Sequence, residues 1–156
     1  MIAVGTKVDD FSLPAHDGTE VHWEELRGSP VVFFFYPKAS TPGCTKEACA
    51  FRDLASAFAS RGVKVFGVSA DSIKRQQNFA TKYELTMPLL SDADKVILEP
   101  WGVWGEKKMY GKTYEGIIRS TFVFDAGGVL RHVWPKVKVT GHADEVLSVV
   151  DDLFRD

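Results

Sequence analysis

The feature that most limits how this chain can fold is an unbroken run of β-branched and aromatic residues at positions 31–36, which ends at Pro37. Such a run is typical of a strand that is buried on both faces of a sheet. Turn residues follow at 40–43, and apolar residues then recur at three- and four-residue intervals through positions 44–60, which is the helical pattern. We therefore expect a central strand, a tight turn and a helix that Gly62 stops.

The remaining segments alternate between strand and helix signals. Two short runs flank the turn residues 16–18 and predict an N-terminal β-hairpin. Further strands are expected at residues 63–68, 87–90, 117–124 and 129–134, of which the last two are joined by a Gly-rich turn. Further helices are expected at residues 72–83, 94–101 and 143–154. This order predicts an α/β chain with a thioredoxin-like fold, in which a mixed central sheet carries helices on both faces.

Composition narrows the classes of function. The chain has 156 residues and no linker or internal repeat, so we expect one domain over residues 1–156. The net charge is −2, and no run of Lys or Arg is long enough to favour nucleic-acid binding. No apolar run is long enough to span a membrane, and no signal-peptide pattern is visible, so we expect a cytoplasmic protein. In that reducing compartment, two nearby cysteines indicate redox chemistry or metal binding rather than a permanent bridge.

Both cysteines lie where the predicted central strand gives way to the predicted helix. In open α/β sheets, ligands bind at the carboxyl ends of strands. Gly43 gives the tight turn before Cys44 conformational freedom of the backbone. Cys44 is expected in the first helical turn, where unpaired N–H groups and the helix dipole favour a thiolate. Thr41 can aim its hydroxyl at the same sulfur or at a bound oxygen. At such a site the thiolate can attack one oxygen of a hydroperoxide, while hydrogen-bond donors stabilise the other oxygen as it leaves.

A permanent positive charge would complete this site. Arg119 begins an apolar strand segment and could present its guanidinium group at the same edge of the sheet. Most arginines are surface groups, so the spacing alone leaves the role of Arg119 open.

Other interpretations of the cysteines stay open on the residues alone. A cysteine on a helix is often buried simply as packing, and this carries more weight for Cys49, whose helical phase differs from that of Cys44. A metal site would need two more ligands, and none of the 4 histidines falls at ligand-like spacing. A thioredoxin-like disulfide reductase would have Cys-x-x-Cys here, whereas this chain has four residues between the cysteines. Counting residues does not rule out a Cys–His hydrolase, although nothing in the sequence points to one. A redox-regulated holdase without turnover would share the same cysteines.

The motifs together resemble those of peroxiredoxins. The pattern Pro-x-x-x-Thr-x-x-Cys, formed by Pro37, Thr41 and Cys44, resembles the active-site motif of that family. The longer Thr-Pro-Gly-Cys-Thr-x-x-Ala-Cys resembles the subfamily called bacterioferritin comigratory protein or peroxiredoxin Q. The resemblance extends over nearly the whole chain, since the subfamily pattern is also found at residues 102–107, 111–117 and 119–122.

The resemblance implies an antioxidant thiol peroxidase that reduces hydrogen peroxide and organic hydroperoxides. It implies that Cys44 attacks the peroxide, that Thr41 positions it, and that Arg119 supports the thiolate and the transition state. Cys49 matches the resolving cysteine of members that carry one in this helix, and Glu47 falls where an acidic residue often accompanies the arginine. A thioredoxin-type dithiol would be the reductant. We expect a monomer, and we expect no metal and no organic cofactor.

The spacing of the cysteines has a structural consequence. In an ideal helix, residues five apart have Cα atoms about 8.7 Å apart, and their side chains point about 140° apart around the axis. A disulfide needs Cα atoms roughly 4.4–6.8 Å apart. A disulfide between Cys44 and Cys49 therefore cannot form in an intact helix, and we expect residues 45–52 to unwind on oxidation.

Overall fold

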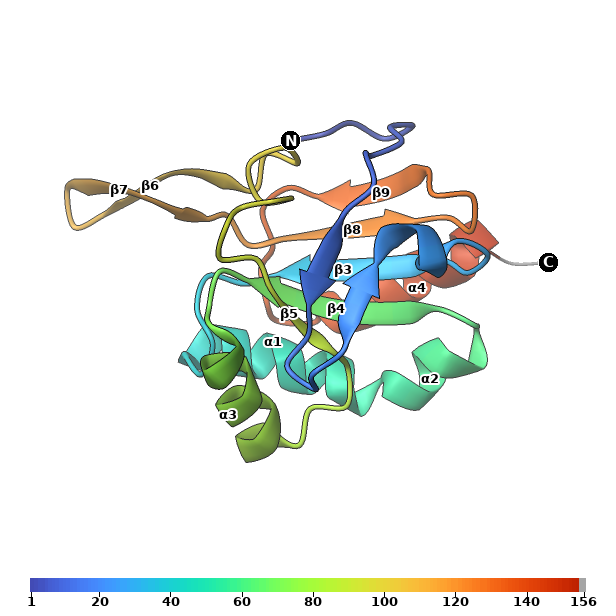
Figure 1. The fold of residues 1–156 in the computed structure, drawn as a ribbon, viewed down its shortest axis with the longest axis horizontal. Helices are drawn as coiled ribbons and strands as arrows, with labels where there is room; N and C mark the ends of the chain where they lie inside the picture. Colours follow the sequence, from blue (N-terminus) through green and yellow to red (C-terminus); the bar gives the residue numbers. More distant parts are fainter. Residues whose placement is uncertain (155–156) are drawn as a thin grey trace.

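The apolar run at residues 31–36 forms strand β3 (Val31–Phe35), in which every residue is buried. In the computed structural model, which describes residues 1–154, β3 is the middle strand of a five-stranded sheet with the order β5-β4-β3-β8-β9 (Figure 1). Strands β4 (Lys64–Ser69) and β5 (Leu89–Ser91) extend the sheet in parallel. Strand β8 (Ser120–Phe124) pairs antiparallel with β3, and β9 (Leu130–Trp134) pairs antiparallel with β8. The expected α/β fold with a mixed sheet is confirmed.

Alternate side chains of β3 enter two separate apolar cores. Val32 and Phe34 belong to the core on the helical side. Four α-helices contribute to it: α1 (Pro42–Asp53), α2 (Ala55–Ser60), α3 (Ile73–Tyr83) and α4 (His142–Phe154). Phe33 and Phe35 enter the opposite core. That core is covered by β1 (Ser12–Pro14), β2 (Glu20–His22), the 3-10 helix η1 (Trp23–Leu26) and residues 97–103.

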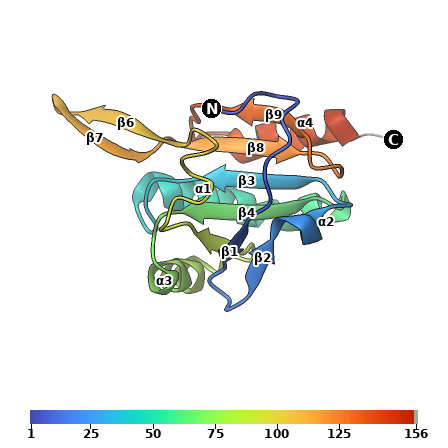
Figure 2. The same ribbon diagram turned by 45° about the horizontal axis from the view of Figure 1, so that its top comes forward.

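Figures 1 and 2 show this layering, with the β1–β2 hairpin in front of the sheet and α1 and α4 behind it. The expected N-terminal hairpin is confirmed, because β1 and β2 pair antiparallel. The face of the sheet opposite the four α-helices carries this hairpin, a short 3-10 helix and turns, although helices were expected on both faces. Within residues 1–154, no helix has the length and apolar character needed to cross a membrane.

The helix expected at residues 94–101 is wrong, because this segment forms a series of turns. Lys95 has a left-handed φ of 58°, which interrupts a right-handed helix. The carboxylate of Asp92 then accepts hydrogen bonds from the backbone N–H groups of Val96, Ile97 and Leu98. The Asp92 side chain thus accepts hydrogen bonds from three backbone N–H groups that would donate to backbone carbonyls in a helix. The periodic spacing of the apolar residues reflects burial in these turns rather than a helix.

The helix expected over residues 44–60 is divided in two at Leu54. The N–H group of Leu54 donates to the carbonyl of Phe51 at 3.1 Å, an i−3 bond that tightens the end of α1. Phe51 and Phe58 are both buried, so the apolar spacing continues across the break. The periodicity therefore predicts the buried face correctly and gives no sign of the interruption.

A second hairpin, which the sequence reasoning missed, is formed by β6 (Trp104–Met109) and β7 (Lys112–Ile117). It projects from the body of the molecule (Figures 1 and 2). Tyr110 and Gly111 at its tip have φ values of 53° and 75°, as a two-residue type I′ turn requires. The strand expected from residue 117 therefore begins only at Ser120.

Candidate active site

Strand register brings the predicted site residues to one edge of the sheet. Phe35, the last residue of β3, pairs with Ser120, the first residue of β8. Arg119 therefore lies beside the point at which the chain leaves β3 for the loop that leads to α1. Phe35 also pairs with Val68 of β4, so the loop that contains Asp71 begins at the same edge. The expectation of a site at the carboxyl end of β3 thus has a physical basis in the register.

The partly buried carboxylate of Asp71 holds the loop between β3 and α1. Asp71 accepts a hydrogen bond from the backbone N–H of Ala39 at 2.7 Å and another from the Ser69 hydroxyl at 2.8 Å. Pro37 follows the end of β3, and Ser40 has a left-handed φ of 65°. A non-glycine residue keeps such a conformation only where its surroundings fix it. The sequence reasoning missed Asp71, although its position just after a predicted strand was a usable signal.

The first turn of α1 offers free backbone donors. Thr41 is the N-cap residue, and the first helical bond runs from the N–H of Thr45 to the Thr41 carbonyl at 2.8 Å. Pro42 has no N–H group, so the N–H groups of Gly43 and Cys44 are the ones left without a helical acceptor. The Thr41 hydroxyl donates to the carbonyl of Lys38 at 2.7 Å and not to the Cys44 sulfur. The Thr41 oxygen therefore remains an acceptor.

Arg119 contacts the sulfur of Cys44. The cysteine is 1% exposed, and Nη2 of Arg119 donates to its Sγ at 3.3 Å. Gly43 permits this approach, because a Cβ at that position would lie 3.2 Å from the same nitrogen. A guanidinium group and the positive end of a helix dipole both favour a thiolate over a thiol. The structure thus brings together Cys44, Arg119 and the helix start, an arrangement that the spacing left open and the family resemblance implied.

Glu47 is held by the other arm of the same guanidinium group. Nη1 of Arg119 donates to Oε1 of Glu47 at 2.7 Å. Glu47 is 1% exposed, and its Oε2 has no hydrogen-bond partner among the residues described. Burial raises the pKa of Glu47 to about 7, against the opposite effect of Arg119. This carboxyl group therefore titrates near neutral pH while it contacts the arginine that contacts Cys44.

A buried histidine supports the site from the helical side. Thr121 lies in β8, two residues after Arg119, and its side chain points to the same face of the sheet as that of Arg119. Its hydroxyl pairs with Nε2 of His142 at 2.7 Å, and both residues are buried. The imidazole also packs edge-on against Phe51 and Trp134. Burial lowers the pKa of His142 to about 4, so the ring is neutral near pH 7.

Cys49 lies in the same helix as Cys44, and both thiols are free. Its side chain is partly buried and packs against the helical-side core. Because α1 is continuous from Pro42 to Asp53, the five-residue spacing keeps the two Cα atoms about 8.7 Å apart. The structure therefore does not bring the two cysteines within disulfide-bonding distance in this state.

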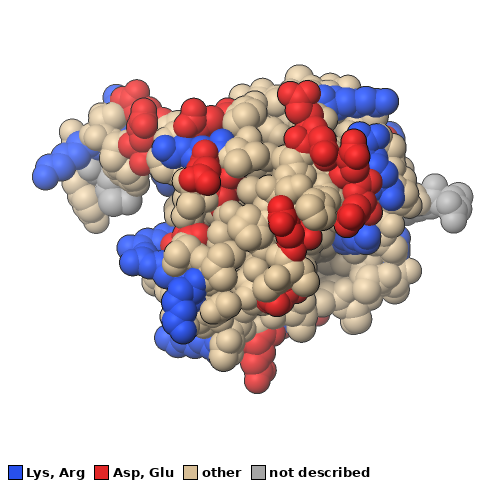
Figure 3. All heavy atoms as spheres, viewed as in Figure 1, with Lys and Arg blue, Asp and Glu red and all other residues tan. Residues whose placement is uncertain are grey.

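The surroundings of the site are basic on one side. On the face shown in Figure 3, basic side chains gather at the left margin, where Figure 1 places α3 and the start of α1. Burial and the charge of Arg119 lower the pKa of Lys107, on the projecting β6–β7 hairpin, whereas Cys44 raises it. The sequence reasoning missed this lysine. Within residues 1–154, no group of three or more His, Cys, Asp or Glu side chains is placed to hold a metal ion.

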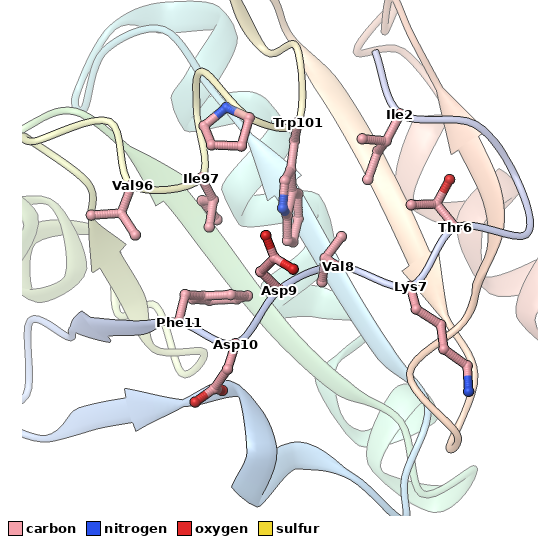
Figure 4. A pocket seen from close by; sticks show the side chains of 11 residues that line it. Ile2, Thr6, Lys7, Val8, Asp9, Asp10, Phe11, Val96, Ile97 and Trp101 are labelled. Atoms are coloured by element: carbon pink, nitrogen blue, oxygen red, sulfur yellow. The ribbon is translucent and has the colours of Figure 1, made fainter.

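The hollow shown in Figure 4 lies away from this site. Its walls come from the N-terminal segment, including Ile2 and Phe11, and from the turns that contain Ile97 and Trp101. Phe11, Ile97 and Trp101 belong to the core on the face of the sheet opposite to Cys44. The hollow is therefore separated from the sulfur by the sheet.

Comparison with known proteins gives consistent matches. Residues 4–133 match the AhpC/TSA family. The chain is 49% identical over 147 residues to a putative peroxiredoxin bcp of Coxiella burnetii, which covers 94% of this chain and 97% of the relative. It is 44% identical to peroxiredoxin Bcp of Escherichia coli K12, with 94% of each chain covered.

Solved structures agree with these matches. The bacterioferritin comigratory protein of Xanthomonas campestris, whose study concerns its alkyl peroxide reduction activity, superposes with a TM-score of 0.89 at 41% identity. That match covers 93% of this chain and 92% of the other. A mutant of PrxQ from Xylella fastidiosa superposes with a TM-score of 0.94 at 32% identity, covering 98% of each chain.

Proposed function

This chain belongs to the AhpC/TSA family and is a thiol peroxidase of the peroxiredoxin class. We propose that Cys44 attacks the peroxide and that Cys49 then forms a disulfide with the oxidised Cys44. The observation that carries the proposal is the 3.3 Å hydrogen bond from Arg119 to the buried sulfur of Cys44. A permanent cation at that distance favours the thiolate, which is the nucleophilic form of cysteine. The proposed substrates are hydrogen peroxide and organic hydroperoxides.

In the first step, the Cys44 thiolate attacks one oxygen of ROOH and the O–O bond breaks. The sulfur becomes a sulfenic acid, and the leaving RO⁻ takes up a proton to give ROH. Arg119 and the free N–H groups of Gly43 and Cys44 are the donors available to stabilise charge on the oxygens. The Thr41 hydroxyl already donates its hydrogen bond to the backbone carbonyl of Lys38. Its oxygen is therefore suited to accept a hydrogen bond from the O–H group of the hydroperoxide.

In the second step, the Cys49 thiol condenses with the sulfenic acid, a disulfide forms and water leaves. The spacing within α1 prevents this step while the helix is intact, so residues 45–52 are proposed to unwind. The break at Leu54 supports the proposal, since it gives α1 its own end before α2 begins. Phe51 opposes unwinding, because its ring stacks on Phe34 with centroids 4.4 Å apart.

In the third step, a thioredoxin-type dithiol reduces the disulfide by exchange and is itself oxidised. The whole cycle converts ROOH and a dithiol into ROH, water and a disulfide. The partial exposure of Cys49 supports this step, because an incoming thiolate must reach one of the two sulfurs. A reducing compartment such as the cytoplasm, where dithiol carriers are kept reduced, suits the cycle.

The experiment is a comparison of two serine variants in an assay with peroxide, thioredoxin, thioredoxin reductase and NADPH. Cys44→Ser should abolish consumption of peroxide. Cys49→Ser should still consume one equivalent of peroxide in a single attack, but should lose turnover with thioredoxin. Normal turnover by Cys44→Ser would overturn the assignment of the attacking cysteine. Oxidation of the unaltered protein without turnover would instead favour a redox-regulated binding protein.

A further inference from the structure

The projecting β6–β7 hairpin returns one charged side chain to the active-site edge. Lys107 on β6 is partly buried, and its ammonium group donates to the carbonyl oxygen of Ile117 at 2.9 Å. Ile117 ends β7 and comes two residues before Arg119. The hydrogen bond therefore fixes the ammonium group at the backbone of a residue two positions before Arg119, whose guanidinium group contacts Cys44.

Two glycines shape the path of this side chain. Gly105 and Gly116 lie directly opposite each other in the hairpin, and Lys107 is on the same face because alternate strand residues share a face. The Cδ atom of Lys107 lies 3.5 Å from the place where a Cβ on Gly116 would be. The stem of Lys107 thus crosses the bare backbone at Gly116 on its way back to the base of the hairpin.

The charge of Lys107 responds to both Arg119 and Cys44. Burial lowers the pKa of Lys107, Arg119 lowers it further, and Cys44 raises it. The last effect is reciprocal, because two charges stabilise each other equally. If the Cys44 thiolate favours the charged form of Lys107, then the Lys107 ammonium favours the thiolate by the same free energy.

We propose that Lys107 is a positioning residue of the peroxidase site, whose ammonium group, held at the carbonyl of Ile117 by the β6–β7 hairpin, stabilises the Cys44 thiolate for attack. The hairpin, which contributes little to either apolar core, thereby becomes part of the active site. Its adjacent residue Lys108 is exposed and points to the opposite face of the hairpin, so it provides a matched control.

Since this role rests on the proposed attack by Cys44, the test uses two reactions of the same sulfur. All proteins carry Cys49→Ser, so that Cys44 is the single thiol. The rate constants for hydrogen peroxide and for iodoacetamide are measured as functions of pH in four further variants: Lys107→Gln, Lys107→Met, Lys107→Arg and Lys108→Gln. The other titratable groups that act on Cys44 or on its partners stay constant in this series: Glu47 on α1, Tyr36 after β3, Arg119 before β8 and His142 on α4.

The two neutral variants, Lys107→Gln and Lys107→Met, should react about three- to ten-fold more slowly with both reagents at neutral pH. The midpoints of both pH profiles should move to higher pH, whereas a merely structural role would leave the midpoints in place. Lys107→Arg should restore the original profile, and Lys108→Gln should leave it unchanged. Unmoved profiles in both neutral variants, or an equal shift in Lys108→Gln, would overturn the role of Lys107.

The two reagents also separate this inference from the proposed function. A shifted iodoacetamide profile in Lys107→Gln, together with slow peroxide reaction in every protein, would support the role of Lys107 and contradict peroxide attack by Cys44. Fast peroxide reaction with identical profiles in every variant would support the attack by Cys44 and contradict the role of Lys107.

Discussion

The guanidinium group of Arg119 donates through Nη2 to the sulfur of Cys44 at 3.3 Å. Its other terminal nitrogen holds the buried carboxylate of Glu47 at 2.7 Å. One side chain just before β8 therefore joins a cysteine and a titratable carboxyl group that both come from α1. This guanidinium group therefore links the titratable carboxyl group of Glu47 to the sulfur of Cys44.

Arg119→Gln should slow the attack on hydrogen peroxide on the order of a hundred-fold. The variant loses the charge that favours the thiolate, and it leaves the Glu47 carboxyl group buried without a cation. Stopped-flow measurement of the first oxidation step checks this. Arg131→Gln is the control, because Arg131 forms a surface ion pair with Asp125 at 3.4 Å. Equal rates in the two variants would contradict the role of Arg119.

Glu47→Gln should alter how stability depends on pH. The folded pKa of Glu47 is about 7 and its ordinary value is 4.5, so between these values the folded form keeps a proton that the unfolded form has lost. The free energy of unfolding of the natural chain should therefore fall as pH rises through this window, by up to about 3 kcal/mol. Urea denaturation over the window should show no such contribution in Glu47→Gln. Parallel pH curves for the two proteins would refute this.

His142→Gln should remove a trend of the opposite sign. The folded pKa of His142 is about 4 and its ordinary value is 6.5, so the unfolded form binds the extra proton between these values. This group should therefore lower the free energy of unfolding as pH falls from 6.5 to 4, by up to about 3 kcal/mol. Acid denaturation should begin at lower pH in the variant, and an unchanged acid limb would contradict the prediction.

Phe51→Leu should speed the formation of the disulfide. Unwinding residues 45–52 must separate the stacked rings of Phe51 and Phe34, and the substitution lowers that cost by about 1 kcal/mol. The loss of free thiols after sulfenic acid formation can be followed by quenched alkylation. Phe58→Leu, in α2, is the control for general loosening of the same core. Equal acceleration by the control would mean that unwinding of α1 is not what limits the reaction.

The elements with a buried face were predictable from the sequence. Strand β3 is apolar throughout because both of its faces meet a core, and α1 buries Cys44, Ala48 and Phe51 at helical spacing. The β6–β7 hairpin was not predictable in this way, because residues 112–115 are exposed and leave no apolar alternation. Its φ-positive turn at Tyr110 lacks the usual Asn or Asp signal.

The candidate site was predictable in its residues but not in its contacts. The Thr-x-x-Cys pattern at a strand end indicates an activated thiol, whereas spacing could not show that Arg119, 75 positions away, would reach that sulfur. The Thr41 hydroxyl turns to the Lys38 carbonyl because a local acceptor is available at 2.7 Å. The pairing of Thr121 with His142 depends on how α4 packs, which no local pattern encodes.

The most direct test of the central claim is the intact mass of the reduced protein, followed over seconds after one equivalent of hydrogen peroxide. The proposed mechanism predicts a rapid loss of two hydrogens, which peptide mapping would assign to a bond between Cys44 and Cys49. Oxidation at the rate of an ordinary free cysteine, or a stable sulfenic acid on Cys44 with Cys49 still reduced, would contradict it.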